Sequence, residues 1–178
     1  CELLGIWNNY SPSDQYKLEN FTARDSKINK HFKFNGIYDK NYIYGEVLKS
    51  GVDDIIEKIN KYKKPTDKDI FIDIGSGSGK LVIHTAIRSN INTLIGVEIV
   101  PQRWAYSKYL KDKYPVNNKS IFFIEKDIRN FDVSMVSIAF MNSLSWDSDL
   151  INDIYNRLNK GCHIISSKSL SQCKILKE

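Results

Sequence analysis

The stretch at residues 70–79 reads IFIDIGSGSG, an apolar run that ends in an acid and then in three glycines at alternate positions. The run at 70–74 predicts a buried parallel strand. Gly75, Gly77 and Gly79 predict a tight turn where the backbone approaches a ligand, because side chains there would clash. A helix is expected over 79–89, with the positive end of its dipole facing the same place. We therefore expect a ligand site at this turn.

Strands and helices alternate along the rest of the chain. Apolar residues with helical spacing predict an amphipathic helix over 51–63. Further strands are expected at 93–98, 121–124, 133–141 and 162–166, and further helices from Pro101 towards Tyr114 and over 150–158, the last closed by Gly161. This alternation predicts a doubly wound, mainly parallel α/β sheet with right-handed crossovers and helices on both faces.

The composition is that of one globular domain. The chain has 178 residues, 42% of them hydrophobic, which is enough for a real core. Residues 1–43 show no sustained periodicity and are interpreted as an N-terminal extension or cap, and residues 44–178 as the ligand-binding core. The chain starts at Cys1 rather than Met, which is compatible with an excised fragment.

Sequence features also bear on metals, membranes and partners. The three cysteines form no metal or disulfide pattern, so no metal site is expected. No apolar run reaches transmembrane length and no signal peptide is visible, so we expect an intracellular protein without a membrane partner. The net charge of +5 permits nucleic acid or an acidic protein surface as a partner. A local basic segment contains Arg24, Lys27, Lys30 and Lys33.

Four polar residues follow the predicted strands: Asp73, Glu98, Asp127 and Asn142. In open parallel sheets, ligands bind beyond the carboxyl ends of the strands. Each acid alone has an ordinary structural explanation, such as capping a helix. Together, around a glycine turn, the four residues predict one binding crevice.

The spacing of the glycines selects among the ligands that such turns bind. A phosphate-binding P-loop needs a first glycine where Ile74 stands and a hydroxyl where Leu81 stands. A dinucleotide fingerprint needs its third glycine one position later than Gly79. An acid, three alternate glycines and a second acid at the end of the next strand are typical of enzymes that use S-adenosylmethionine. A carboxylate such as Glu98 can accept from both ribose hydroxyls, and a nearby carboxylate and carbonyls can hold the cofactor's ammonium group.

The sequence resembles the Dot1 histone-lysine methyltransferases, which are class I enzymes with a Rossmann-like fold. The resemblance covers residues 42–170. It rests on the following segments: Tyr44-Gly45-Glu46, residues 71–79, Gly96-Val97-Glu98, Phe140-Met141-Asn142 and Ile165-Ser166-Ser167-Lys168. The glycine motif alone indicates class I, and the first and last segments indicate the narrower family.

The resemblance implies roles for individual residues. Tyr44, Gly45 and Glu46 are expected to fold over the methionine end of the cofactor. Asp73, Gly75, Ser76, Gly77 and Gly79 are expected to line it. Glu98 is expected to bind the ribose, Asp127 and Ile128 to flank the adenine, and Asn142 to lie beside the transferable methyl group. The catalytic residues expected on this basis are Tyr44, Asn142 and Trp146, with Trp146 as an aromatic wall of a lysine channel or, alternatively, a core residue.

The sequence also departs from the family's pattern. Ser143 and Leu144 stand where a second asparagine and an aromatic residue are usual, and Ser169-Leu170 replaces Pro-Phe. The chain ends before the closing hairpin expected of this fold, so we interpret the core as truncated. The segment after Asn142 lacks the Pro-Pro-aromatic motif of DNA-base methyltransferases. His84 and His163 are interpreted as structural.

The expected activity is methylation of a protein lysine, with histone H3 on nucleosomes as the best substrate and the nucleus as the location. The basic segment would then help to hold DNA phosphates. Two alternatives stay open. One is a class I methyltransferase acting on RNA or another substrate in the cytoplasm. The other is an inactive methyltransferase-fold binding module.

Overall fold

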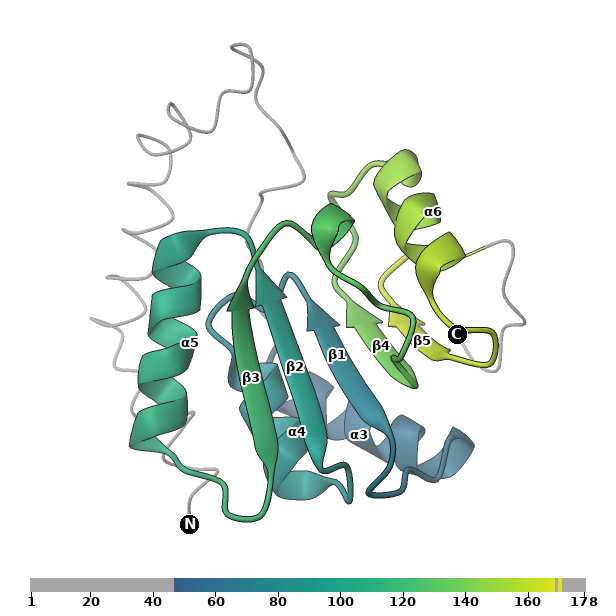
Figure 1. Ribbon diagram of the computed structural model, residues 1–178. Coiled ribbons are helices and arrows are strands. Elements are labelled where there is room, and N and C mark those ends of the chain that lie inside the picture. The colour runs from purple at the N-terminus through teal and green to yellow at the C-terminus, as the bar shows by residue number, and fades with distance from the viewer. Residues whose placement is uncertain (1–46, 169, 171–178) are drawn as a thin grey trace.

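The computed structural model describes residues 47–168 and residue 170, which form a five-stranded sheet between helices (Figure 1). The elements in chain order are α3 (Lys49–Tyr62), β1 (Ile70–Ile74), α4 (Lys80–Arg88), β2 (Thr93–Glu98), α5 (Pro101–Lys113), β3 (Ser120–Glu125), the 3₁₀ helix η3 (Ile128–Asn130), β4 (Ile138–Met141), α6 (Ser148–Arg157) and β5 (His163–Ser166). The predicted boundary between an extension at 1–43 and a core at 44–178 falls outside the described residues.

The sheet has the strand order β3-β2-β1-β4-β5, and every neighbouring pair is parallel. The order reverses at β1, where β2 lies on one side and β4 on the other. Parallel doubly wound sheets open a binding crevice at such a point, because the connections on either side leave the sheet in opposite directions. The glycine turn follows β1 directly. The predicted fold class is therefore confirmed, with helices on both faces.

Each face of the sheet has its own core. Residues of β1 alternate between the faces, so Phe71 packs towards α3 and α4, which lie behind the sheet in Figure 1. Ile72 packs towards α6 in front. The spacing of Val52, Ile56 and Ile59 on α3 matches the helical period, and all three are buried. The strand β1 is buried on both faces because it lies at the centre of the sheet.

Two local predictions were wrong. The fourth strand does not start at Val133; it comprises only Ile138–Met141. Val133 and Val136 are buried, but they lie in a turn in which the Val136 N–H donates to the Val133 carbonyl at 3.1 Å. Burial gives both conformations the same apolar pattern, so the sequence could not separate them.

The second correction concerns Gly161, which does not close the last helix. Helix α6 ends at Arg157, and Leu158 is already extended. Gly161, with φ of 94°, lies in the turn before β5. Leu158 also packs in the core, so the helical spacing of apolar residues continues to it. The spacing therefore predicted a helix that extends one residue beyond the observed end.

Candidate functional site

The glycine turn between β1 and α4 curls over the end of β2. Gly75 and Gly77 have positive φ angles of 74° and 52°, a conformation that glycine adopts without steric cost. The N–H groups of Gly75 and Ser76 both donate to the Val97 carbonyl, at 2.8 and 3.0 Å. The turn therefore lies at the carboxyl ends of the two central strands.

Glu98 closes this turn from the end of β2. Its side chain is 4% exposed. Oε2 accepts a hydrogen bond from the Gly77 N–H, and Oε1 accepts one from the Val100 N–H, both at 2.8 Å. An ionised carboxylate has about four acceptor positions, so these two bonds fix its orientation and leave acceptor capacity for the hydroxyl groups of a ligand.

Asp73 is a second buried carboxyl group, near Glu98. Burial, and next the negative charge of Glu98, raise the pKa of Asp73 to about 8. Two adjacent buried acids resist double ionisation. A positive group of a ligand beside Asp73 would offset this repulsion and favour the ionised form. The pair is therefore suited to a ligand that carries both a cation and hydroxyl donors.

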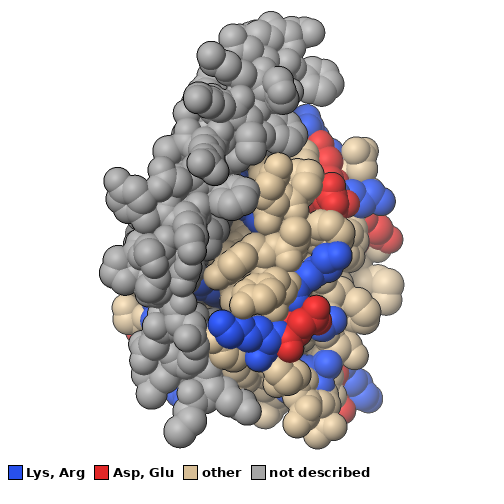
Figure 2. Space-filling model, turned by 90° about the vertical axis from the view of Figure 1, so that its left-hand side faces the viewer, with Lys and Arg blue, Asp and Glu red and all other residues tan. Residues whose placement is uncertain are grey.

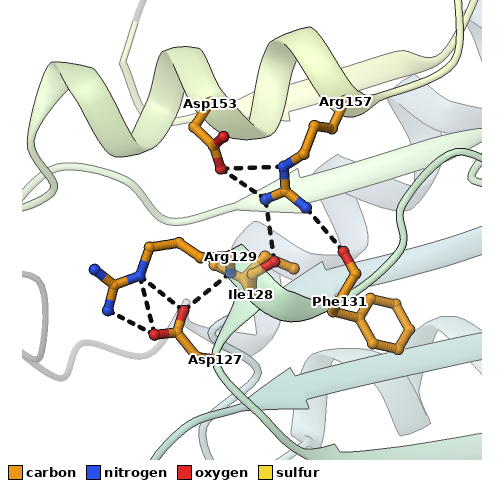
Figure 3. A network of polar contacts seen from close by, with 6 residues as sticks. All are labelled: Asp127, Ile128, Arg129, Phe131, Asp153 and Arg157. Atoms are coloured by element: carbon orange, nitrogen blue, oxygen red, sulfur yellow. Dashed lines mark hydrogen bonds and ion pairs between the residues drawn. The ribbon is translucent and has the colours of Figure 1, made fainter.

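Asp127 caps the short helix η3 after β3. Its Oδ1 accepts from the Arg129 N–H at 2.9 Å, and the Arg129 guanidinium also contacts both carboxylate oxygens (Figure 3). Burial alone would raise the pKa of Asp127, but these hydrogen bonds hold it below its usual value. Ile128 packs in the core on the α6 side of the sheet. Asp127 is therefore an ionised acceptor at the end of the strand that neighbours β2.

Arg157 of α6 joins η3 to the rest of the domain. Its Nη1 donates to the Phe131 carbonyl at 2.8 Å, and its Nη2 donates to the Ile128 carbonyl at 3.1 Å (Figure 3). Nη2 and Nε also donate to Asp153 of the same helix, at 2.8 and 3.1 Å. Sequence reasoning missed Arg157, because nothing in the sequence shows that the last turn of α6 faces the segment after β3.

Asn142 follows β4 and lies beside the glycine turn. The preceding residue, Met141, pairs with Ile74 of β1. The next residue, Ser143, is fully buried, and its hydroxyl lies 2.8 Å from the hydroxyl of Ser166 at the end of β5. The loop that carries Asn142 is therefore attached to the neighbouring strand. Ser143 was noted in the sequence only as a departure from the family's pattern, and its contact with Ser166 explains why a small hydroxyl residue suits this position.

Trp146 closes the same loop but packs in the core. It is 8% exposed, and its ring lies 3.1 Å from where a Cβ on Gly75 would be. Its carbonyl accepts a hydrogen bond from Lys168 Nζ at 2.6 Å. The structure therefore gives Trp146 a packing role against the glycine turn, the alternative already noted from the sequence. Its role in a lysine channel stays a prediction.

Two other residues of the turn are in close contact with the protein itself. A Cβ on Gly79 would lie 2.5 Å from the Phe123 ring and 2.7 Å from Ser107 Cβ, so this glycine allows α4 to pack against α5 and β3. The Ser76 hydroxyl lies against Gly96 and is buried, with no hydrogen-bond partner in the described part of the chain. Cofactor binding by Gly79 and Ser76 stays a prediction.

The structure brings six of the predicted positions to the carboxyl edge of the sheet: Asp73, Gly75, Gly77, Glu98, Asp127 and Asn142. Tyr44, Gly45, Glu46 and the basic segment lie outside the described residues. Lys80, the first residue of α4, is buried, and the sequence assigned it no role. His84 Nε2 lies 2.9 Å from Asp53 of α3, a contact between helices that fits its structural interpretation. Within residues 47–168 and 170, no three His, Cys, Asp or Glu side chains gather as metal ligands.

Comparison with known proteins identifies the family. The family described as "Histone methylation protein DOT1" matches residues 26–176. An H3 lysine-79-specific histone-lysine N-methyltransferase of Caenorhabditis elegans is 25% identical over 175 residues, covering 89% of this chain and 18% of the relative. A protein of the same name from Candida glabrata is 26% identical over 161 residues, covering 82% of this chain and 23% of the relative.

A solved structure shares the fold. The RNA methyltransferase of Salinibacter ruber, in complex with S-adenosyl-L-homocysteine, aligns with a TM-score of 0.58 and 20% identity over 68% of this chain and 76% of that one. The predicted resemblance is confirmed, because the family match extends over most of the sequence and the glycine turn lies within it. The chain belongs to the DOT1 family of histone methylation proteins.

Proposed function

We propose that this chain is the core of an S-adenosylmethionine-dependent methyltransferase. The cofactor, when bound, supplies a methyl group already activated by its sulfonium charge. The observation that carries the proposal is the hydrogen bond from the Gly77 N–H to Glu98 Oε2 at 2.8 Å. It joins the glycine turn to the acid of the next strand, and it leaves acceptor positions on Glu98. Membership of the DOT1 family supports the same activity.

The residues present fit the chemistry of this cofactor. Glu98 accepts from the ribose hydroxyls. Asp73, whose carboxyl group is buried with a raised pKa, holds the ammonium group of the methionine end. The turn residues Gly75, Ser76, Gly77 and Gly79 allow close approach of the backbone. Asp127 and Ile128 flank the adenine, and Asp127 accepts from its exocyclic amine.

The remaining assignments concern the methyl group and the core's boundaries. Asn142 lies beside the glycine turn and orients the substrate amine towards the methyl group, together with Tyr44. Tyr44, Gly45 and Glu46 close over the methionine end, so the core begins at residue 44 and residues 1–43 form an extension or cap. A lysine amine has a reference pKa of about 10.4 and must lose its proton to water before transfer. Desolvation near the cofactor's positive charge favours that loss.

The proposed substrate is a lysine of a histone, with H3 on nucleosomes favoured by the names of the two relatives. The chain spans about a fifth of the length of each of these relatives. Its substrate and partners are therefore proposals and do not follow directly from those of the whole relatives. A nuclear location follows from a chromatin substrate. No helix in the described part of the chain is long and apolar enough to cross a membrane.

Contact with nucleosomal DNA is proposed through the basic segment that contains Arg24, Lys27, Lys30 and Lys33. Figure 2 shows the face formed by α5 and β3, on which Lys and Arg lie among Asp, Glu and uncharged residues. Mixed charges on the described part of this face attract phosphates less than a surface of one sign would. The basic segment is therefore the better candidate for holding DNA.

A two-stage experiment tests the proposal. Titration calorimetry with S-adenosylmethionine is expected to show binding at micromolar concentrations, and absence of heat would refute the cofactor assignment. Transfer of labelled methyl groups is then measured on nucleosomes, free histones and RNA, with Gly77→Arg as the inactive control. Methylation of nucleosomes by the wild type, with none by Gly77→Arg, supports the proposal. Binding without transfer to any substrate indicates a binding module, and transfer only to RNA indicates a different enzyme.

A further inference from the structure

We propose that Arg157 of α6 is a positioning residue that makes the cofactor site selective for adenine, and this inference rests on the proposed function. Arg157 does not belong to the glycine turn or to the strand ends. It acts on the segment that carries Asp127, through two backbone carbonyls of the turn that follows it.

The contacts of Arg157 span the whole turn. One guanidinium nitrogen donates to the Ile128 carbonyl at 3.1 Å and another to the Phe131 carbonyl at 2.8 Å. Ile128 and Phe131 lie on either side of the last two residues of η3. A planar guanidinium that bridges both carbonyls holds the turn in one conformation. Figure 3 shows Arg157 reaching from α6 over this turn.

The guanidinium is itself held in place. Asp153, one helical turn earlier, accepts from Nε at 3.1 Å and from Nη2 at 2.8 Å. The helix is anchored because Ile151 and Ile154 are buried in the core that also contains Ile128. Arg157 therefore fixes the position of η3 relative to α6, a helix that is itself packed in the core.

Asp127 is the functional group at the start of this turn. Its Oδ1 accepts from the Arg129 N–H at 2.9 Å, so the carboxylate orientation follows the conformation of η3. Three N–H groups of Arg129 contact the carboxylate: the backbone N–H, the Nε–H, which both oxygens share, and one N–H of Nη2. About one of the four acceptor positions therefore remains for a ligand. Because only one acceptor position remains, the carboxylate must be held accurately for a ligand donor to reach that position. The exocyclic amine of adenine is a donor, whereas hypoxanthine carries a carbonyl oxygen there, which a carboxylate repels.

The test compares two ligands, S-adenosylhomocysteine and S-inosylhomocysteine, by calorimetry on the whole chain. In the second ligand the exocyclic amine is replaced by a carbonyl oxygen, and the neighbouring ring nitrogen N1 gains a hydrogen. The wild type is expected to bind the adenine ligand at least about tenfold more tightly, the effect of one hydrogen bond to a charged group. In Arg157→Leu this ratio is expected to fall towards one. Arg157→Lys keeps the charge but cannot bridge both carbonyls, and an intermediate ratio is expected.

The ratio separates positioning from a loss of folding. Partial unfolding lowers the binding-competent fraction and weakens both ligands by the same factor, so it leaves the ratio unchanged. Arg88→Leu, which removes an arginine from the last turn of α4, is the matched control and is expected to keep the wild-type ratio. A wild-type ratio in Arg157→Leu, or no discrimination by the wild type, would overturn the inference. Failure of the wild type to bind either ligand would instead overturn the proposed function, and the inference with it.

Discussion

Glu98 and Gly77 are joined by a hydrogen bond of 2.8 Å between the side-chain Oε2 and the backbone N–H. They lie 21 positions apart in the sequence, and the parallel pairing of β1 with β2 brings them together. The bond both satisfies a backbone donor of the turn and orients a buried carboxylate. The shape of the proposed ribose site therefore depends on both residues.

Glu98→Gln is expected to weaken binding of S-adenosylhomocysteine by about tenfold or more, because a charged acceptor for hydroxyl groups becomes a neutral one. Calorimetry measures the effect. Glu125→Gln is the matched control, since Glu125 pairs with Glu98 in the sheet but is exposed. Equal affinities for Glu98→Gln and the wild type would contradict the ribose assignment.

Gly79→Ala is expected to destabilise the protein more than Gly161→Ala. Both glycines have positive φ, 78° and 94°, so both substitutions incur backbone strain. Only at Gly79 would the new Cβ meet other atoms, at 2.5 Å from Phe123, whereas nothing lies within 4 Å of it at Gly161. Overpacking adds about 1–3 kcal/mol. Urea denaturation measures the difference in free energy of unfolding, and equal losses would show that Phe123 and Ser107 move aside freely.

The raised pKa of Asp73 predicts that the ligand-free protein loses stability as the pH rises from about 4 towards 8. In this range the unfolded chain is ionised at Asp73, whereas the folded chain keeps its proton, so the folded state binds more protons. The free energy of unfolding therefore falls by up to about 1.4 kcal/mol per pH unit from this group. Asp73→Asn stays neutral in both states and is expected to flatten the dependence. Denaturation of both proteins across this range checks it, and parallel curves would contradict it.

Asp73 also predicts a proton linkage of cofactor binding. At pH 6 the buried carboxyl group is protonated, and the ammonium group of S-adenosylmethionine favours the ionised form. Binding is expected to release a proton, seen as a heat that varies with the ionisation enthalpy of the buffer. Asp73→Asn should abolish this contribution. If the wild type binds without proton release, Asp73 does not hold the ammonium group.

Lys168→Met is expected to lower the free energy of unfolding by about 1.5–3 kcal/mol, the usual effect of a hydrogen bond to a charged group. Its ammonium donates to the Trp146 carbonyl at 2.6 Å and holds the loop that follows Asn142. The Trp146 ring of the same loop packs against Gly75 of the glycine turn, so the loosened loop is also expected to weaken binding of S-adenosylhomocysteine. Urea denaturation and calorimetry measure the two quantities, with exposed Lys160→Met as the control. An unchanged stability would show that the contact contributes little in solution.

Much of the fold was predictable because local patterns carried it. The apolar run at 70–74 marks β1, and the acid Glu98 marks the end of β2. The spacing of the glycines predicted a turn that binds a ligand. The strand at 133–141 was overextended, because Val133 and Val136 are buried in a turn and burial has the same sequence signature in both conformations. The contacts of Arg157 and Ser143 were unpredictable, because each partner comes from a distant segment.

The sequence by itself determined the order of strands and helices, the glycine turn and the acids at the strand ends, because each of these follows from neighbouring residues. Only the tertiary structure decided which of these groups meet. Parallel pairing placed the Glu98 carboxylate on the Gly77 N–H, burial together with Glu98 raised the pKa of Asp73, and the packing of α6 placed Arg157 on the turn after Asp127. Hydrogen bonds and charge interactions depend on distances through space, and only the folded chain sets those distances.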